Sequence, residues 1–287
     1  MCTLIIGRDV VAPGSVLLAA NRDEDPGRPS DPPGILCESP RLVGGRDRRA
    51  GGTWLAVREA RAVVALLNRR DVPGEPAPGA PGLRSRGALV LEVAGAADDA
   101  PVGSTPPAAP SGGRPEPGSR AADGPTPPPD GDHLADAALR RAAALVRGAR
   151  FAPCTLLFAS PRVSWLMTLE TDGMPRFEPL ASGWHVLTHA DLDDPGEPRT
   201  AWLVGALAGF APSSPDEAGN RLDALLRSHG DPAAGIPPVC LHRGAMRTVS
   251  ASSVWLTAGE ARYRHAEGRP CEHPFADHSH LLRAPRP

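Results

Sequence analysis

The chain contains 287 residues, of which 41% are hydrophobic and 22% are charged, and its formal net charge at pH 7 is −2. A chain of this length can bury one sizeable core or two small ones, and its nearly neutral balance provides no bulk electrostatic attraction to nucleic acid or to a membrane surface. Five Phe and one Tyr are also too few to interleave with a basic patch, which further disfavours nucleic-acid binding.

The N-terminus lacks the pattern of a secretory signal. The apolar run from Thr3 to Ile6 is short and is followed at once by Arg8 and Asp9. No stretch reaches the roughly 18 apolar residues that a membrane span requires. Five cysteines, an odd number, fit reduced thiols better than a disulfide framework. We therefore expect a soluble, cytoplasmic protein with no membrane partner.

Short β-rich runs joined by turn residues occupy the first part of the chain. The expected strands are Cys2–Ile6, Val16–Asn21, Thr53–Val57 and Ala62–Leu67. Consecutive runs of this kind form antiparallel hairpins. Ser85 can cap a following helix whose apolar positions, spaced four apart up to Ala97, would lie on the sheet.

A segment rich in Pro, Ala and Gly at about 98–132 divides the chain. Its composition cannot form a packed core, so we expect a disordered insertion within a single domain that spans 1–287. After it we expect a helix at His133–Arg147, strands at Cys154–Ser160, Ser164–Leu169 and Trp184–Thr188, a helix capped by Ser214, and a hairpin of Arg247–Leu256 with Ala261–His265. This order predicts an α+β fold with two helical layers around antiparallel sheets.

A cysteine directly behind the initiator methionine has a specific chemical meaning. Removal of Met1, which is usual before a small residue, would leave Cys2 with a thiol and a free α-amine on one Cα. The reference pKa values are about 8.5 for the thiol and about 7.7–8.0 for the amine, so the amine can act as the general base for its own thiol. The alternative is that Cys2 is only a small buried hydrophobe at the start of a strand.

The sequence Asn-Arg-Asp-Glu at 21–24 ends the second strand next to the head of the first. Strand alternation sends Arg22 and Asp23 to opposite faces, and we expect Asp23 to be the inner one, where its carboxylate can hold the Cys2 amine. Arg22 would then favour the thiolate or bind an anionic group of a substrate. The alternative is a solvated turn that carries charges.

Several ordered motifs resemble those of the NRDE-motif family, which is related to transport and Golgi organization protein 2. They are "MCTLII", "LLAANRDE", "LVGGRDRRAGGTWLAV", "VVALLNRRD" and "SRGAL", with weaker likeness in "HVLTHADLDDPGEPR" and "TVSASSVWL". The resemblance implies the four-layer αββα fold of N-terminal nucleophile (Ntn) hydrolases, in the cysteine branch that includes penicillin V acylase and bile-salt hydrolase. It also implies that Cys2 is the nucleophile, that Asp23 contacts its amine, that Arg22 belongs to the catalytic set and that Asn68 donates to the oxyanion.

Asn68 and Trp54 also have roles that follow from their positions. An uncharged amide at a strand end, as at Asn68, can stabilise an oxyanion without repelling a substrate, although an ordinary turn asparagine is equally consistent. Trp54 follows Gly51 and Gly52 and would supply an apolar wall beside a close backbone approach, unless the glycines only form a turn.

Further substrate-binding candidates come from the second half of the chain. His189 stands where the related family usually has an asparagine, which would change a second oxyanion donor. Thr248, Ser250 and Ser252 alternate, so one strand face would present three hydroxyls to a pocket. The alternative is an edge strand that is merely rich in Ser and Thr.

Cysteines and histidines near the C-terminus raise the question of a metal site. The candidate ligands are Cys240, His242, Cys271, His273, His278 and His280. Their spacings match no standard zinc finger, so we expect no metal and no other cofactor. A phosphate-binding loop is excluded by the absence of lysine.

Two classes of function remain. The first is a cysteine amidohydrolase or acyltransferase that acts on a small non-peptide amide through an acyl-Cys2 intermediate. The second, implied by the family resemblance, is a carrier or chaperone for haem or lipid, in which the Cys2 thiolate could ligate haem iron. The partner is a small molecule in either case, and the sequence does not define an oligomeric state.

Overall fold

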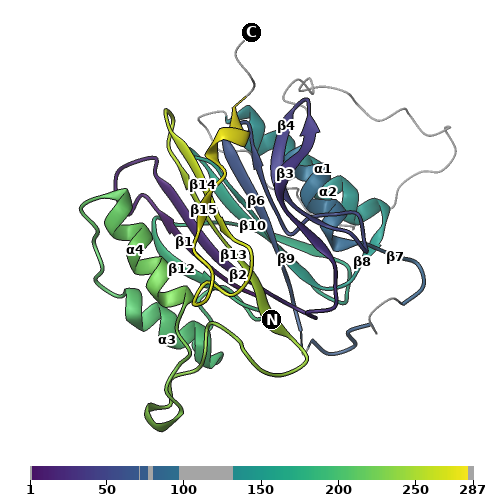
Figure 1. The fold of residues 1–287 in the computed structure, drawn as a ribbon. Helices are drawn as coiled ribbons and strands as arrows, with labels where there is room; N and C mark the ends of the chain where they lie inside the picture. The colour runs from purple at the N-terminus through teal and green to yellow at the C-terminus, as the bar shows by residue number, and fades with distance from the viewer. Residues whose placement is uncertain (1, 71, 77–79, 97–131, 284–287) are drawn as a thin grey trace, which may run out of the picture.

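Two antiparallel sheets packed face to face, with helices on both outer faces, form the four layers of the molecule (Figure 1). The computed structural model describes residues 2–70, 72–76, 80–96 and 132–283. The six-stranded sheet has the order β12-β1-β2-β13-β14-β15. Its strands are β1 (Thr3–Arg8), β2 (Val16–Glu24), β12 (Gly183–Leu187), β13 (Arg247–Leu256), β14 (Ala261–Ala266) and β15 (Ala276–Asp277).

The second sheet has seven strands in the order β11-β10-β9-β6-β5-β4-β3. They are β3 (Ser30–Glu38), β4 (Arg41–Asp47), β5 (Leu55–Arg58), β6 (Ala62–Asn68), β9 (Cys154–Ala159), β10 (Ser164–Leu169) and β11 (Pro175–Pro179). A short parallel pair, β7 (Leu83–Arg84) with β8 (Arg150–Phe151), lies beside it.

Helices cover the outer face of each sheet. The helices are α1 (Arg86–Ala94) and α2 (His133–Gly148) on the seven-stranded sheet, and α3 (Pro198–Leu207) and α4 (Pro215–Leu226) on the six-stranded sheet, with 3-10 turns η1 (Pro232–Ala234) and η2 (Ser279–Leu282). Side chains of Asp132, Glu197 and Ser214 accept hydrogen bonds from the first turns of α2, α3 and α4, which sets where these helices begin.

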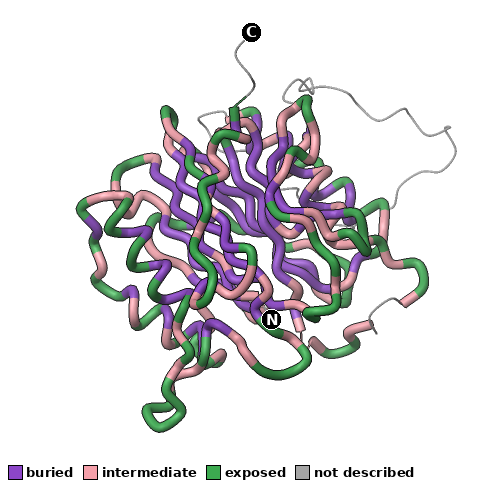
Figure 2. Tube along the Cα trace, viewed as in Figure 1, coloured by how far each residue is buried: buried purple, intermediate pink, exposed green. Residues whose placement is uncertain are grey.

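Side chains along the paired strands β1 and β2 point alternately into two parts of the core. Leu4 and Leu18 face the space between the sheets, whereas Ile5 and Leu17 face α3 and α4. Figure 2 shows that the strands of both sheets are mostly buried and that exposed residues gather in the helices and loops. Because the period is two, Cys2 and Arg22 fall on the inter-sheet side and Asp23 on the helix side.

The expected α+β architecture, with two antiparallel sheets between helical layers, is confirmed. The longer elements that the sequence pattern does not predict are β3, β4, β11 and α3; the two-residue strands β7, β8 and β15 and the 3-10 turns η1 and η2 are also not predicted. β3 is an edge strand that contains two prolines at 32–33 and has mostly exposed or half-buried side chains, so its sequence lacks the usual strand pattern. α3 is a short helix that begins at a proline. Ser85 precedes α1 as expected, but its side chain makes no cap hydrogen bond.

The predicted insertion at 98–132 lies outside the described residues except for Asp132. That residue is ordered as the N-cap of α2, and its carboxylate also accepts a hydrogen bond of 2.6 Å from the Ser160 hydroxyl. Asp132 therefore belongs to the start of α2, and the prediction of a disordered insertion stays a prediction. No helix in the described ranges combines the length and apolar character that a membrane span requires.

Candidate active site

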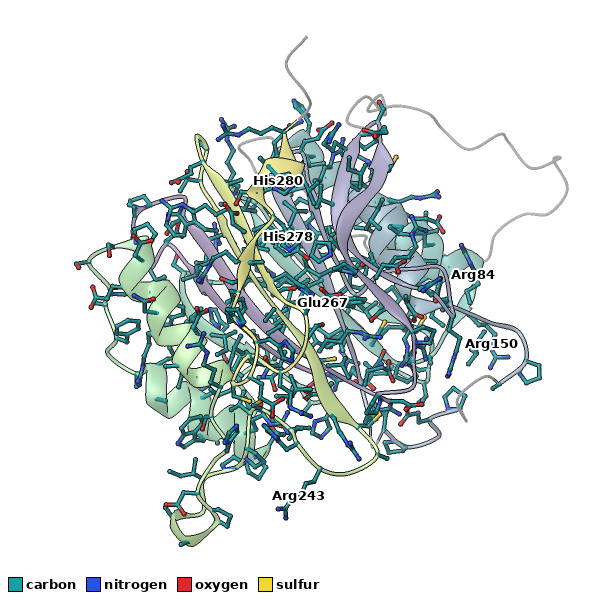
Figure 3. The ribbon with its side chains drawn as sticks, in the orientation of Figure 1. Arg84, Arg150, Arg243, Glu267, His278 and His280 are labelled. Atoms are coloured by element: carbon teal, nitrogen blue, oxygen red, sulfur yellow. The ribbon has the colours of Figure 1, made fainter. Side chains whose placement is uncertain are left out.

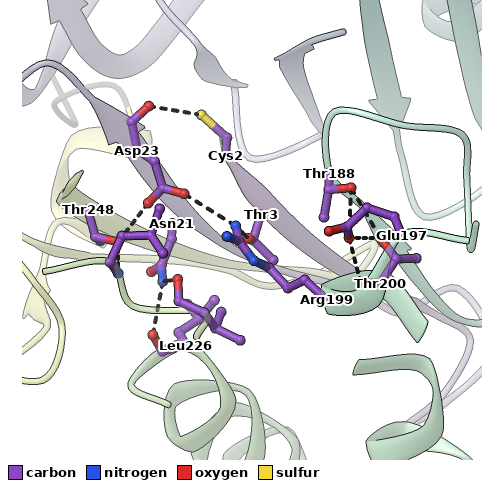
Figure 4. A network of polar contacts seen from close by, with 12 residues as sticks. Cys2, Thr3, Asn21, Asp23, Thr188, Glu197, Arg199, Thr200, Leu226 and Thr248 are labelled. Atoms are coloured by element: carbon purple, nitrogen blue, oxygen red, sulfur yellow. Dashed lines mark hydrogen bonds and ion pairs between the residues drawn. The ribbon is translucent and has the colours of Figure 1, made fainter. Parts of the chain in front are cut away.

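Cys2 lies immediately before β1, where antiparallel pairing with β2 brings Thr3 opposite Asn21. The Cys2 Sγ is 3.8 Å from the backbone carbonyl oxygen of Asp23 (Figure 4), and the residue is partly buried against the inter-sheet core. Burial raises the pKa of the Cys2 thiol, and the nearby charge of Asp23 raises it further. The thiol is therefore predominantly protonated at neutral pH and needs a base to become a nucleophile.

The Asp23 side chain is held by groups from two other segments, β13 and α3. Its Oδ1 accepts a hydrogen bond of 2.6 Å from the Thr248 hydroxyl, and its Oδ2 lies 3.5 Å from Nη1 of Arg199. The carboxylate is fully buried. Burial raises the pKa of Asp23 to about 6, while the Thr248 hydrogen bond and the Arg199 charge act in the opposite direction. The side chain is consequently rigid, and it titrates just below neutral pH.

A β-bulge in the pairing of β13 with β2 determines which way the Thr248 side chain points. The β13–β2 register shifts between Thr248 and Ser250, so Thr248 stands opposite Asp23 and Ser250 opposite Arg22. Ser252 contacts a different group, with its hydroxyl 2.9 Å from Nδ1 of a buried histidine on β14. The expectation that these three hydroxyls share one face is therefore wrong, because the extra residue at the bulge reverses the alternation for Thr248.

Arg22 occupies the opposite side of β2 from Asp23, as strand alternation predicted. Its guanidinium carbon lies 4.3 Å from the centre of the Trp54 ring, and its Nη1 donates a hydrogen bond of 3.3 Å to the Ser30 hydroxyl. Burial lowers the pKa of the Arg22 guanidinium. Arg22 shares the inter-sheet face with Cys2, because position 22 has the parity of the inward-facing positions, and Asp23 lies on the helix side of β2. Contact between the Asp23 carboxylate and the Cys2 α-amine stays a prediction.

One cavity of about 720 Å³ brings most of the predicted residues together. The predicted site residues that line it are Cys2, Arg22, Asp23, Trp54 and Asn68. Asn68 ends β6, is partly buried and stands opposite Cys154 of β9. Five residues from separate parts of the first 70 positions thus converge on one space.

The other three predicted residues lie outside this cavity. His189 lines a neighbouring hollow of about 620 Å³ that shares Arg70 with the first. Thr248 and Ser250 are buried in β13 and are absent from the described residues that line the Cys2 cavity. The structure places Thr248 beneath Asp23, where it contacts the carboxylate and not the open space.

A close contact between two backbones forms one wall of the cavity. A Cβ placed on Gly52 would lie 2.5 Å from the carbonyl carbon of Gly87, so both positions need glycine for α1 to approach the loop before β5. The first residue of α1, Arg86, lines the same cavity, and its Nη1 donates a hydrogen bond of 2.9 Å to the carbonyl oxygen of Pro153. Burial lowers the pKa of this guanidinium.

Arg199 is a residue of the candidate site that the sequence analysis did not single out. Its Nη1 donates a hydrogen bond of 2.9 Å to the Thr3 hydroxyl and lies close to Asp23 (Figure 4). The carboxylate of Glu197 fixes the start of α3 by accepting a hydrogen bond of 2.7 Å from the backbone N–H of Thr200. The signal in the sequence is Glu197 followed by a proline, which is typical of the first turn of a helix.

Asn21, the first residue of the Asn-Arg-Asp-Glu motif, has a structural role. Its Nδ2 donates hydrogen bonds of 2.9 Å to the Leu226 carbonyl oxygen and of 3.1 Å to that of Val239. These bonds tie β2 to the end of α4 and to the following loop. Within the motif, Asn21 therefore anchors the strand, whereas Arg22 and Asp23 line the cavity from opposite sides of β2.

Comparison with known proteins agrees with this arrangement. Residues 1–101 match the model of the family described as Transport and Golgi organisation 2, which confirms the resemblance seen in the N-terminal motifs. A search of the curated proteins finds no sequence that matches the chain.

Two solved structures are similar over most of their length. The Caenorhabditis elegans N-acylethanolamine-hydrolyzing acid amidase ortholog is 12% identical, with a TM-score of 0.53 over 88% of this chain and 92% of that chain. Penicillin V acylase from Agrobacterium tumefaciens is 12% identical, with a TM-score of 0.50 over 93% of this chain and 83% of that chain. The chain therefore has the αββα sandwich fold of the Ntn-hydrolase-type acylases.

Proposed function

We propose that this protein is a cysteine hydrolase or acyltransferase that cleaves the amide bond of a small non-peptide substrate through an acyl-Cys2 intermediate. The observation that carries the proposal is the position of the Cys2 thiol, in a cavity of about 720 Å³ together with Arg22, Asp23 and Asn68. The similarity to amide-hydrolysing structures supports the same class of reaction.

Activation of the thiol requires that Cys2 be the first residue of the mature chain. Its free α-amine, with a reference pKa of about 7.7–8.0, would then accept the thiol proton. The raised pKa of the buried thiol makes this base necessary. Asp23 would hold the resulting ammonium group, and Thr248 with Arg199 would keep the carboxylate in place.

The reaction then proceeds in two steps, acylation of Cys2 and transfer of the acyl group to water or an amine. The Cys2 sulfur forms a bond to the amide carbonyl carbon, and the electron pair of the C=O bond moves to oxygen, where the Asn68 amide donates a hydrogen bond. When the oxyanion collapses, the C–N bond breaks and the α-ammonium gives its proton to the leaving amine. Water or an acceptor amine next attacks the thioester carbon, the C–S bond breaks, and the thiol is restored.

The walls of the cavity suggest an acyl group with an anionic end. Trp54 and Leu66 supply apolar surface. Arg86 also lines the cavity, and its guanidinium donates a hydrogen bond to the backbone carbonyl oxygen of Pro153. A substrate with a carboxylate or phosphate group would complete this environment.

Labelling with an acyl electrophile tests the proposal. We expect an alkyne-tagged β-lactone to modify the purified protein once, with Met1 absent and the label on Cys2 in peptide mapping. The matched variants are Cys2→Ser, which should not be labelled, and Cys37→Ser, which should be labelled normally because Cys37 lies on the edge strand β3. Retention of Met1 with the label on Cys37 or Cys154 would refute the enzyme.

The same measurement separates the enzyme from a carrier for haem or lipid. A carrier needs no free α-amine, so its Met1 can be retained without loss of binding. Retained Met1 combined with stoichiometric haem or lipid in the purified protein would favour the carrier, whereas turnover of an amide with a free Cys2 amine supports the enzyme.

A further inference from the structure

Four side chains with metal-binding atoms meet outside the described lining of the Cys2 cavity. They are His229, just after α4; Cys240 and His242, on the loop before β13; and Cys271, in the turn after β14. All four ligand atoms lie within 4.8 Å of one another. Three segments that are distant in sequence therefore supply two thiols and two imidazoles to one point.

The distances within this cluster are close to those of a tetrahedral site, with the shortest one slightly below the ideal range. The Cys271 Sγ lies 3.5 Å from the Cys240 Sγ and 3.1 Å from Nε2 of His242, and the Cys240 Sγ lies 3.8 Å from the same nitrogen. Zinc bonds of about 2.3 Å to sulfur and about 2.0–2.1 Å to nitrogen give tetrahedral ligand separations of about 3.3–3.8 Å. The sulfur atoms are too far apart for a disulfide, whose S–S bond is about 2.05 Å.

We propose that His229, Cys240, His242 and Cys271 bind one Zn²⁺ ion in a closed structural site. Two thiolates with two imidazoles are the donor set that selects zinc among the common divalent metals. On binding, each cysteine thiol gives up one proton to solvent and forms a Zn–S bond, and each neutral histidine forms a Zn–N bond. Two protons are released, and the two thiolate charges balance the charge of the metal ion.

The surroundings of the cluster support this assignment. Nδ1 of His242, the nitrogen that points away from the sulfurs, lies 3.6 Å from Oε1 of Glu272. A carboxylate on the outer nitrogen of a ligating histidine orients the ring toward the metal. Glu272 is itself held by Arg269 at 2.7 Å, and the backbone N–H of Cys240 donates a hydrogen bond of 2.8 Å to the Ser228 carbonyl oxygen.

This cluster differs from the run of histidines near the C-terminus that the sequence analysis considered. His278 and His280 lie along the C-terminal segment, at the other end of the molecule from Arg243, which follows His242 in the chain (Figure 3). Of the histidines in the C-terminal run, none joins the described cluster, whereas His229 does. The expectation of no metal rested on sequence spacing, which cannot show that a residue from the end of α4 completes the set.

The cluster also reaches the candidate active site through the backbone. Leu241 lies between the two ligands Cys240 and His242, and its N–H donates a hydrogen bond of 2.8 Å to the Thr248 hydroxyl. The N–H of Thr248 donates one of 3.0 Å to the Leu241 carbonyl oxygen, and the Thr248 hydroxyl donates to Asp23. A metal that fixes this loop would position Thr248 and hence Asp23. This effect on reactivity rests on the proposed function; the metal binding itself does not.

Metal analysis of untagged protein tests the site. We expect about one zinc per chain after dialysis, and exchange for Co²⁺ should give intense near-ultraviolet sulfur-to-cobalt charge-transfer bands with tetrahedral visible bands. Cys240→Ser and Cys271→Ser should lose most of the metal, whereas Cys37→Ser and His280→Ala should retain it. Chelation of the wild type should lower its melting temperature and slow Cys2 labelling.

Other results would overturn the proposal. Wild-type protein without stoichiometric zinc or cobalt charge-transfer bands, and with a nonreduced mass two hydrogens below the reduced mass, would mean that Cys240 and Cys271 form a disulfide. Full metal retention in both cysteine variants would place the zinc elsewhere. If these variants do not fold, the cobalt spectrum of the wild type still shows whether cysteine sulfur binds the metal. If wild-type protein contains one zinc per chain but its Cys2 is not labelled, the proposed function is refuted and the metal proposal stands.

Discussion

The Cys2 cavity and the cluster of His229, Cys240, His242 and Cys271 are two cysteine sites built in different ways. Regular strand pairing builds the first: the β1–β2 register alone brings Cys2 to Asp23. Loops that meet only in the folded molecule build the second. A thiol placed by a strand end can remain open to a substrate, whereas a thiol surrounded by three other ligands is suited to a closed structural role.

Thr248 connects the two sites. Its hydroxyl accepts a hydrogen bond from the Leu241 N–H in the loop of the cluster and donates one to Asp23 at the candidate active site. The two sites are thus distinct in chemistry but share a short path of hydrogen bonds. Substitutions should separate their primary effects and should reveal this connection as a smaller, common effect.

The largest expected effect is a double dissociation between the two kinds of cysteine. Cys2→Ser should lower amide turnover at least about 10³-fold, because a hydroxyl is a far weaker nucleophile here, and should leave the zinc content unchanged. Cys240→Ser should remove zinc and lower the melting temperature while Cys2 remains reactive. Turnover assays, metal analysis and melting curves check both. Equal loss of zinc in both variants would contradict the separation.

Asp23→Asn is expected to lower the rate of Cys2 alkylation without unfolding the protein. The amide keeps the shape of the carboxylate but removes the charge that would hold the α-amine, and lost positioning of this kind costs on the order of 10²-fold. The rate of Cys2 alkylation at neutral pH measures the effect. Asp25→Asn is a matched control, because Asp25 is an exposed carboxylate just beyond β2. Equal rates in wild type and Asp23→Asn would remove Asp23 from the catalytic set.

The buried Asp23 should also make stability depend on pH. Because its pKa rises from 3.8 to about 6 on folding, its contribution is fully present below about pH 4 and is lost as the pH increases through 6. The difference in unfolding free energy between wild type and Asp23→Asn should therefore shift against the wild type by up to about 3 kcal/mol from pH 4 to pH 7. Denaturant titrations at several pH values measure it, and a constant difference would contradict the pKa.

Thr248→Val should affect both regions moderately. The change keeps the shape but leaves Asp23 without its hydroxyl donor and the Leu241 N–H without its acceptor, which costs about 1–3 kcal/mol for buried groups. Thr248→Ser keeps the hydroxyl and should recover most of the stability and of the Cys2 alkylation rate. Zinc should remain bound in both variants. If Thr248→Val changes neither the stability nor the Cys2 alkylation rate, the hydrogen bonds from Leu241 through Thr248 to Asp23 do not couple the two sites.

Arg22→Lys should have the smallest effect and should act on substrate binding. Lysine keeps the charge but loses the planar stacking on Trp54, which is worth about 0.5–1 kcal/mol, so KM should rise a few-fold with kcat unchanged. Arg46→Lys, at a partly exposed arginine of β4, serves as the control. A fall in kcat with unchanged KM would instead make Arg22 the group that tunes the nucleophile.

Local patterns account for the parts of the site that could be predicted. Period-two alternation placed Arg22 and Asp23 on opposite faces, and the turn between two apolar runs placed Cys2 beside the end of the second strand. The amide of Asn68 and the ring of Trp54 reached the same cavity because each stands at the end or the beginning of a strand of the second sheet.

The limits of the strand pattern have identifiable causes. Alternation defines two faces but does not say which of them turns toward the space between the sheets, which is the face that Arg22 and Cys2 share. A single extra residue between Thr248 and Ser250 reversed the pattern of hydroxyls. Bulges of this kind arise from the strand that pairs with them, and the strand's own sequence does not reveal them.

The sequence by itself determined the pairing of the first two strands, the α+β layering and the cysteine at the head of β1, since these depend on residues close together in the chain. Only the tertiary structure decided that Arg199 reaches Asp23 from α3 and that His229 and Cys271 meet Cys240 and His242. The physical reason is that periodicity reports the environment of neighbouring residues, whereas contacts between distant loops depend on how complete layers pack against one another.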